Sequence, residues 1–256
     1  MVHDRVRVLS FAPSIAGRLS AEMELSSLAR RGDLVLCMGN LPPLLPCAGK
    51  LIVFLQNRYL VDDLSLDGFP MRARLRIALE RMWLRLRFNQ SIRLIVQTPS
   101  MQGAAQNALG FSSHILPFFA YPEPKPSLRP DRVAGFLFPA TAEKHKNHMK
   151  LLAAWKMLHE SGVYEQLHLT VDGNRDVLLQ ISQLQRDGVS IINHGHLGRG
   201  QLSSLYQRCA ALIYPSYLES FGLPLLEAKA MGLPIIASEM DYVRDVTVPA
   251  ETFDPH

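Results

Sequence analysis

The chain has 256 residues, 48% of them hydrophobic, and can therefore bury the core of one large domain or of two smaller ones. Its 27 Lys and Arg nearly balance 23 Asp and Glu, so a net charge of +4 gives no reason to expect a nucleic-acid-binding protein. Cys37, Cys47 and Cys209 are odd in number, widely spaced and without a CxxC pair, which argues against a disulfide framework or a zinc site.

The first residues and the apolar runs bear on the location of the protein. No run of about 18 uninterrupted apolar residues occurs. Asp4, Arg5 and Arg7 occupy positions where a signal peptide needs its apolar region. We therefore predict a cytoplasmic protein without a transmembrane segment.

Short apolar runs alternate with helical patterns in the first half of the chain. This alternation is typical of a parallel sheet covered by helices. It predicts an incomplete doubly wound α/β unit. The predicted strands are VRVLSF (6–11), DLVLCM (33–38), KLIVFLQ (50–56) and RLIVQT (93–98), and the predicted helices cover 18–30 and 71–89.

A proline-rich segment, YPEPKPSLRPD, covers residues 121–131. Prolines favour an extended backbone and are excluded from central strands and helix interiors. We therefore predict a linker here, with domains at 1–122 and 123–256.

The second half repeats the alternation of strands and helices. The predicted strands are VAGFLF (133–138), LHLTV (167–171), VSII (189–192), ALIY (211–214) and PIIAS (234–238), with helices at 147–160, 176–186, 201–208 and near Pro224. The predicted fold class is therefore α/β, with two Rossmann-like domains facing a cleft, the first domain being incomplete. Strand carboxyl ends and helix amino ends meet in such a cleft.

The segment PSYLESFGLPLLEAKAMG, residues 215–232, carries the strongest chemical signal because it reads as a loop and a helix directly after a strand. Pro224 suits the first turn of that helix, and Gly222 lets the backbone approach a ligand closely. The helix amino end offers N–H groups and a favourable dipole, which would hold a diphosphate beside Phe221, Gly222 and Leu223.

Two carboxylates frame this loop, Glu219 before it and Glu227 in the helix. Carboxylates accept hydrogen bonds from sugar and ribose hydroxyls. On spacing alone, an equally good interpretation is that Glu227 complements the helix dipole and that Glu219 is solvated.

ESFGLPLLEA resembles the donor-site signature of the family 4 glycosyltransferases of the GT-B fold, two glutamates separated by seven residues around such a loop. Further landmarks follow in the family order through the second half: FLFPATAEKHKNHMKLLAAW, LHLTVDG, HGHLGRGQLSSLYQRCAALIYPS, GLPIIASEMDYVRDV and FDP.

The resemblance implies roles for individual residues. Glu227 would hold the ribose hydroxyls of a nucleotide, Glu219 would contact the donor sugar, and Lys146 would neutralise the departing diphosphate, for which an ammonium is suited. Ser220 belongs to the same loop. Relatives often carry an arginine before the lysine, and the stretch PATAEK has none.

Two further positions are placed near the donor by the resemblance. Gly173 corresponds to a glycine turn, for which an ordinary strand-to-helix turn is an equally good explanation. Leu197 lies in the loop NHGHLGRG, which borders the nucleotide base. The nearby histidines His145, His148, His194 and His196 lack carboxylates in register, so we predict supporting roles and no metal.

The first half is similar to the family's acceptor domain in GNLPPLL, KLIVFLQNRYL and RLIVQTPSMQ. Many relatives carry a histidine where this chain has Gln56 and Asn57, so a histidine-dependent role is not expected there. The opening strand and closing helices of the family are not evident. The sequence looks trimmed at both ends, which makes an inactive homologue one open alternative.

Residues 71–93 interleave arginines with large apolar residues. This pattern suits an anionic membrane surface and predicts peripheral docking near a lipid-linked acceptor. An ordinary amphipathic helix with solvated arginines is an equally weighted alternative. The arginines are Arg72, Arg74, Arg76, Arg81, Arg85, Arg87 and Arg93.

The predicted reaction is sugar transfer from a nucleoside-diphosphate sugar to a hydroxyl of a glycan or lipid-linked acceptor. The resemblance implies retention of anomeric configuration, no metal or other cofactor, and a role in polysaccharide or lipopolysaccharide assembly at the inner face of a membrane. A non-catalytic nucleotide-sugar-binding subunit is the main alternative. Nucleic-acid binding is not expected, because no recognised module is present.

Overall fold

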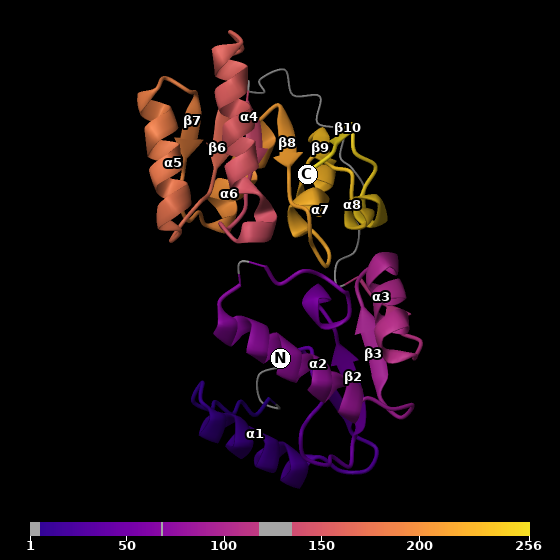
Figure 1. The fold of residues 1–256 in the computed structure, drawn as a ribbon. Helices are drawn as coiled ribbons and strands as arrows, with labels where there is room; N and C mark the ends of the chain where they lie inside the picture. The colour runs from indigo at the N-terminus through magenta and orange to yellow at the C-terminus, as the bar shows by residue number, and fades with distance from the viewer. Residues whose placement is uncertain (1–5, 68, 118–134) are drawn as a thin grey trace. The chain divides into compact units, whose positions relative to one another are not determined.

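The computed structural model describes residues 6–67, 69–117 and 135–256. The chain divides into two compact units, Met1–Leu116 and Pro117–His256, each built on its own parallel sheet (Figure 1). The linker predicted at 121–131 and the domain boundary predicted after residue 122 lie outside the described residues. The cleft expected between the domains stays a prediction.

The first unit has a four-stranded parallel sheet in the order β1-β2-β3-β4. Its core lies on β2 and β3, where Val53, Leu94 and Val96 are fully buried. The strands are β1 (Leu34–Cys37), β2 (Lys50–Phe54), β3 (Arg93–Val96) and β4 (His114–Ile115), and the helices are α1 (Ile15–Leu28), η2 (Arg58–Leu60), α2 (Met71–Arg87) and α3 (Pro99–Leu109).

Local capping sets the ends of these helices. Ser14 Oγ accepts a hydrogen bond from the Gly17 N–H at 3.1 Å, so α1 begins before the predicted start at residue 18. Thr98 caps α3 through the Met101 N–H, and the helix ends at Gly110 in the left-handed conformation (φ 75°).

The strand predicted at residues 6–11 is wrong. The structure assigns no strand there, and Val6, Val8, Leu9 and Phe11 are exposed. A strand requires a neighbouring backbone for its hydrogen bonds, and in the described sheet β1 pairs with β2 alone. Apolar alternation alone therefore did not produce a strand.

The second unit has a six-stranded sheet in the order β10-β9-β8-β5-β6-β7, and every pairing is parallel. The strands are β5 (Phe136–Phe138), β6 (Leu167–Leu169), β7 (Ile191–Asn193), β8 (Ala211–Tyr214), β9 (Ile235–Ser238) and β10 (Glu251–Phe253). The five strands predicted in this half are confirmed, and β10 is an addition that was too short to recognise.

Helices alternate with these strands along the chain. They are η3 (Lys144–Lys146), α4 (His148–Glu160), α5 (Arg175–Arg186), α6 (Arg199–Arg208), α7 (Leu223–Ala230) and α8 (Asp241–Val246). Helices α4 and α5 lie side by side on one face of the sheet (Figure 1). Because the chain then reverses direction across the sheet, right-handed crossovers place α6 on the opposite face.

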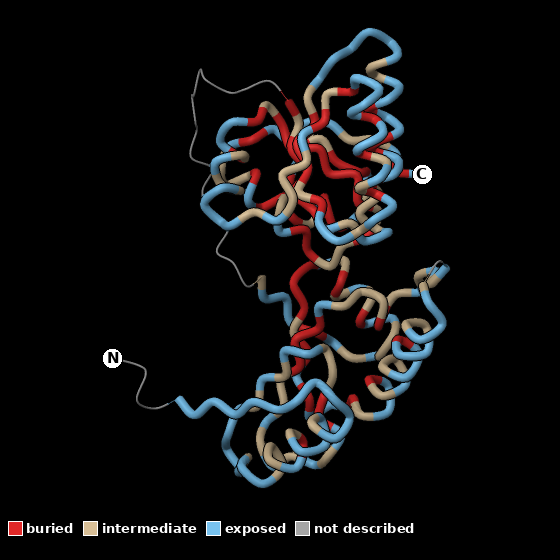
Figure 2. The backbone as a smooth tube through the Cα atoms, turned by 90° about the vertical axis from the view of Figure 1, so that its left-hand side faces the viewer, coloured by how far each residue is buried: buried red, intermediate tan, exposed pale blue. Residues whose placement is uncertain are grey.

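Burial explains why these segments are helices and strands. Val177, Ile181 and Leu184 recur at helical spacing on α5 and are buried against the sheet, whereas β8 is buried along its whole length because both faces of the sheet are covered. Figure 2 shows the buried residues concentrated in the strands and in the inner faces of the helices of each unit.

The strand order reverses between β5 and β8. From β5 the chain proceeds to β6 and β7, then returns to the other side of β5 for β8, β9 and β10. Adjacent loops at such a reversal run in opposite directions and leave a crevice at the carboxyl ends of the strands, where doubly wound proteins bind ligands. The loops after β5 and β8 are therefore the expected place for a site.

We predict that Leu212→Ala destabilises the second unit by about 2–5 kcal/mol, because Leu212 is fully buried on β8 between β5 and β9. Urea unfolding followed by Trp155 fluorescence would measure this effect. Trp155 is buried in the core of the second unit, and Trp83→Phe removes the other tryptophan from the signal. The exposed Leu179→Ala on α5 serves as control and should change stability by less than about 0.5 kcal/mol.

Candidate functional site

The loops after β5 and β8 bring two of the predicted site residues together. Lys146 Nζ lies 2.6 Å from Glu219 Oε1, and the side chains are only 16% and 11% exposed. Lys146 belongs to η3 after β5, and Glu219 follows β8. The residues are 73 positions apart in sequence, and the reversal of strand order makes them neighbours.

Hydrogen bonds to backbone carbonyl groups join the same two loops. The Tyr217 N–H donates to the His145 carbonyl oxygen at 3.0 Å, and Asn147 Nδ2 donates to the Pro215 carbonyl oxygen at 3.2 Å. Asn147 adopts the left-handed conformation (φ 62°) between η3 and α4, a conformation that asparagine tolerates better than most residues. The position of Lys146 is therefore set by several hydrogen bonds besides its ion pair.

The loop before α7 has the backbone that the sequence predicts for Gly222. Gly222 is buried with φ 80° and ψ 61°, and an added Cβ would lie 3.0 Å from Leu225 Cδ1. Both the conformation and the tight space favour glycine. Pro224 stands in the first turn, and no side chain caps the amino end of α7, which leaves that end available to an anion.

The other loop residues differ in exposure. Ser220 is half-buried, Phe221 is buried in the core of the second unit, and Leu223 is exposed at the start of α7. Phe221 therefore anchors the loop, while Ser220 and Leu223 keep surface that a ligand can contact.

Glu227 is exposed on α7, about one turn after the helix begins at Leu223. Its Oε2 accepts a hydrogen bond from the Tyr206 hydroxyl at 2.7 Å. Tyr206 lies on α6 and is buried. Burial, together with the neighbouring Glu227 carboxylate, raises the pKa of the Tyr206 phenol well above its ordinary value. The raised pKa favours the protonated hydroxyl, which donates to Glu227.

A second buried tyrosine donates a hydrogen bond to Glu219. The Tyr214 hydroxyl donates to Glu219 Oε1 at 2.9 Å, the same oxygen that Lys146 contacts. Sequence reasoning missed both tyrosines. Tyr214 ends an apolar strand and Tyr206 lies on the inner face of a helix, so in sequence they look like core residues.

Gly173 and Leu197 lie in loops at the same edge of the sheet, after β6 and β7. Gly173 has φ 76° with open space around it. The next residue, Asn174, caps α5 through the Val177 N–H and donates from Nδ2 to the Ala142 carbonyl oxygen. These contacts fit an ordinary strand-to-helix turn. Both loops lie on the other side of β5 from Glu219.

The histidines fall into two groups. His148 is buried with its ring 4.7 Å from that of Phe138, and burial, followed by the Lys146 charge, lowers its pKa to about 4, although Glu143 acts in the opposite direction. His168 Nδ1 and His194 Nε2 lie 3.0 Å apart in stacked rings, and burial lowers the pKa of each. Among the described residues, no group of three or more His, Cys, Asp or Glu could hold a metal ion.

In the first unit, Gln56 is exposed just beyond the carboxyl end of β2. Asn40, in the left-handed conformation (φ 68°), accepts hydrogen bonds on Oδ1 from the Gln56 N–H at 2.6 Å and the Asn57 N–H at 2.9 Å. The asparagine therefore fixes the backbone at the position where relatives were expected to carry histidine.

A parallel α/β unit with a lysine, two carboxylates and an uncapped helix at its strand-order reversal defines a class of proteins that bind phosphorylated ligands at strand ends. The comparison with family models identifies the family. The model "Glycosyl transferases group 1" matches residues 122–253, and the chain belongs to this family.

Curated relatives match less than half of the chain. The O-antigen chain mannosyltransferase B of Escherichia coli is 32% identical over 114 residues, which are 43% of this chain and 30% of that protein. The O-antigen chain mannosyltransferase RfbU of Salmonella typhimurium is 28% identical over 116 residues, which are 43% of this chain and 31% of the relative. The matched stretch thus spans less than a third of either relative.

Solved structures resemble nearly the whole chain. TarM has a TM-score of 0.69 at 13% identity, covering 94% of this chain and 49% of TarM. WaaG, a glycosyltransferase involved in lipopolysaccharide biosynthesis, has a TM-score of 0.62 at 19% identity, covering 93% of this chain and 69% of WaaG. These likenesses confirm the predicted α/β fold class, and the family match confirms the resemblance to glycosyltransferases.

We predict that His148 makes the fold sensitive to acid. Its pKa falls from an ordinary 6.5 to about 4 in the folded protein, so between these values the unfolded chain binds a proton that the native state does not. Stability should therefore fall as the pH drops from 6.5 to 4, by about 1 kcal/mol per pH unit at the steepest point.

Urea unfolding of the native protein and of His148→Leu across this pH range would measure the effect. The variant keeps apolar volume against Phe138 and should show a flatter decline. Some decline should persist, because the pKa values of His145, His168 and His194 are also lowered. Equal slopes in the two proteins would contradict the prediction.

Proposed function

We propose that the protein transfers a sugar from a nucleoside-diphosphate sugar to a hydroxyl of an acceptor. The observation that carries this proposal is the Lys146–Glu219 pair at the strand-order reversal, next to the Gly222 loop and Glu227. The chain supplies a cation for a diphosphate, an uncapped helix end for the same anion, and carboxylates for hydroxyl groups. The family match supports this assignment.

In this proposal the diphosphate lies between Lys146 and the amino end of α7. Glu227 accepts hydrogen bonds from the ribose hydroxyls, and Glu219 contacts the donor sugar. Negative charge grows on the diphosphate as it leaves, and a preorganised ammonium and backbone N–H groups stabilise this charge. The proposal invokes no metal or other cofactor.

The proposed reaction retains the anomeric configuration. The bond from the anomeric carbon to the diphosphate oxygen breaks, and the acceptor oxygen forms its bond to that carbon on the same face. The acceptor proton passes to an oxygen of the departing diphosphate. Because this oxygen takes the proton, the mechanism requires no histidine near Gln56.

The ion pair has a consequence for donor binding. Lys146 Nζ already contacts Glu219 Oε1 at 2.6 Å. A diphosphate that reaches Lys146 therefore competes with Glu219 for the ammonium protons, and Glu219 gains freedom to meet the sugar. Lys146 and Glu219 would in this way respond to the donor together.

The relatives of this chain support a particular class of acceptor. Two curated relatives are O-antigen chain mannosyltransferases, and WaaG is a glycosyltransferase involved in lipopolysaccharide biosynthesis. We therefore propose a glycan or lipid-linked acceptor in polysaccharide or lipopolysaccharide assembly. The alternative is a nucleotide-sugar-binding subunit without activity of its own.

We predict that nucleotide sugars stabilise the native chain, by about 2.7 kcal/mol at 100 times the dissociation constant. Thermal unfolding with UDP, GDP, ADP and their hexose conjugates would measure this effect. Lys146→Ala and Glu227→Ala should each weaken binding roughly tenfold or more, because each removes a charged hydrogen-bonding partner.

The matched controls are Lys156→Ala and Glu160→Ala, which remove an exposed pair on α4 and should leave the shift intact. Loss of the shift in the controls as well would argue against the assigned site. Release of nucleoside diphosphate in the presence of acceptor separates a transferase from a binding subunit, which would bind the donor without turnover.

We also propose that α2 docks the protein on an anionic membrane surface. Met71, Leu75, Leu79, Met82 and Leu86 recur every three or four residues and are each more than half exposed. Only Ile77 and Leu84 of this helix are buried. The apolar side chains are therefore divided between the core and an exposed stripe, which the ordinary amphipathic alternative does not explain.

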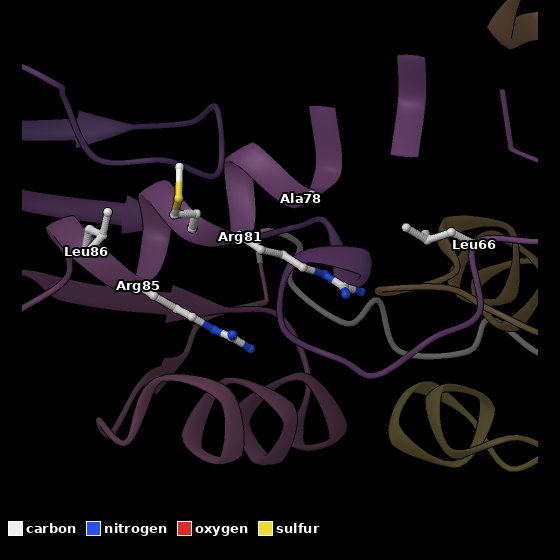
Figure 3. Close-up of a pocket in the computed structure, with 6 residues that line it drawn as sticks. Leu66, Ala78, Arg81, Arg85 and Leu86 are labelled. Atoms are coloured by element: carbon white, nitrogen blue, oxygen red, sulfur yellow. The ribbon is translucent and has the colours of Figure 1, made fainter. Parts of the chain in front are cut away.

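Arginines accompany the exposed stripe. Figure 3 shows Arg81 and Arg85 extending from neighbouring turns of α2 at a hollow of about 400 Å³, which Leu66, Ala78 and Leu86 also line. Arg81 is held by the carbonyl oxygens of Tyr59 and Asp62. Exposed apolar residues beside cations favour the interface of an anionic bilayer. No helix in the described part of the chain is long and apolar enough to cross a membrane.

We predict that the protein sediments with vesicles of phosphatidylcholine and phosphatidylglycerol but not with phosphatidylcholine alone. The triple variant Leu75→Ser, Leu79→Ser, Met82→Ser should lose most of this binding, because it removes the exposed apolar stripe. Leu179→Ser, exposed on α5, is the control. A native protein that stays in solution with both kinds of vesicle would remove the membrane proposal.

A further inference from the structure

Each of the two site glutamates is held from the protein core by one tyrosine hydroxyl. Tyr214, the last residue of β8, donates to Glu219 Oε1 at 2.9 Å, and Tyr206 on α6 donates to Glu227 Oε2 at 2.7 Å. The exposed fractions of these tyrosines are 0% and 2%. The two contacts come from different elements and share no atom.

Burial makes these hydroxyls reliable donors. A phenol in an apolar core needs a hydrogen-bonding partner, because its desolvation is otherwise uncompensated. Burial also raises the pKa of both phenols, which favours the protonated form that donates. The glutamate is the nearer acceptor of Tyr206, whose hydroxyl also lies 3.5 Å from the Pro224 carbonyl oxygen.

The two glutamates need this support for different reasons. Glu219 Oε1 accepts from both Lys146 and Tyr214. If the ammonium turns to a diphosphate, Tyr214 becomes the contact that keeps the carboxylate in place. Glu227 is exposed on α7, and its flexible side chain has several rotamers, of which the Tyr206 hydrogen bond selects one.

We propose that Tyr214 and Tyr206 are positioning residues for the donor, Tyr214 acting through Glu219 on the sugar and Tyr206 acting through Glu227 on the ribose. The inference rests on the proposed function, since it assigns the two ends of a nucleotide sugar to the two glutamates. Neither tyrosine touches the donor. Their effects should differ, because a nucleoside diphosphate has the ribose but lacks the sugar.

The test compares two pairs of probes, GDP with GDP-mannose and UDP with UDP-glucose, by titration calorimetry. Tyr214→Phe should weaken binding of the nucleotide sugar roughly tenfold and change binding of the nucleoside diphosphate by less than about twofold. Tyr206→Phe should weaken both members of a pair by the same factor, roughly tenfold, because both contain the ribose.

Tyr242→Phe provides a matched structural control. Tyr242 is fully buried in the same core, its ring lies 6.3 Å from that of Tyr214, and its hydroxyl donates to the Ser216 carbonyl oxygen at 2.6 Å instead of to a glutamate. A general loss of packing would appear in all three variants. Only positioning produces a selective loss for the nucleotide sugar in Tyr214→Phe.

A double-mutant cycle tests whether Tyr214 acts through Glu219. In the Glu219→Ala background, Tyr214→Phe should cause no further loss of nucleotide-sugar binding. Three results would overturn the inference while donor binding by the native protein stands. They are a further tenfold loss in the double variant, equal losses for both probes in Tyr214→Phe, and the same selectivity in Tyr242→Phe. Absence of binding by the native protein would overturn the proposed function, and the inference with it.

Discussion

The reversal of strand order between β5 and β8 is the constraint on which the second unit depends. Parallel strands put all their carboxyl ends on one edge of the sheet, and the reversal separates two adjacent loops there. Lys146 and Glu219 then become neighbours without any strain in the sheet. The same reversal requires helices on both faces, which accounts for the continuous burial of β8.

The polar site is attached to the apolar core at several points. Phe221 anchors the loop before α7 in the core, the tyrosines reach outward from buried positions, and Gly222 closes the tight turn at the start of that helix. These groups lie close to strand ends and helix starts, so they have less conformational freedom than they would have in a long loop. Such preorganisation reduces the cost of ordering side chains around a ligand.

Much of this arrangement could be predicted from the sequence. The run ALIY matches β8 at both ends, and the Gly222 and Pro224 pattern located the start of α7, because turn chemistry and buried strands leave strong local signals. The strand predicted at residues 6–11 is wrong because a strand needs a neighbouring strand to pair with, and the local sequence does not show whether one is present. The short elements α8 and β10 carry too few residues for a periodic pattern.

The site could be predicted from the sequence only in part. The resemblance singled out Lys146, Glu219 and Glu227, and the structure brings the first two together, while the chemical roles assigned to all three stay predictions. Tyr206 and Tyr214 could not be found, because a buried tyrosine in an apolar run has the same local pattern whether or not its hydroxyl reaches a carboxylate. Only the fold shows which atom lies at the end of that side chain.

Under the proposed function, the contact between Lys146 and Glu219 would also affect how a donor reaches the site. A cation that is already neutralised by a neighbouring carboxylate produces little electric field beyond the Debye length of about 8 Å at physiological ionic strength. Long-range attraction would then contribute little to the encounter with a nucleotide, and its association rate would depend only weakly on salt. The protein would then distinguish one donor from another mainly by the lifetime of the bound complex, which short-range hydrogen bonds determine.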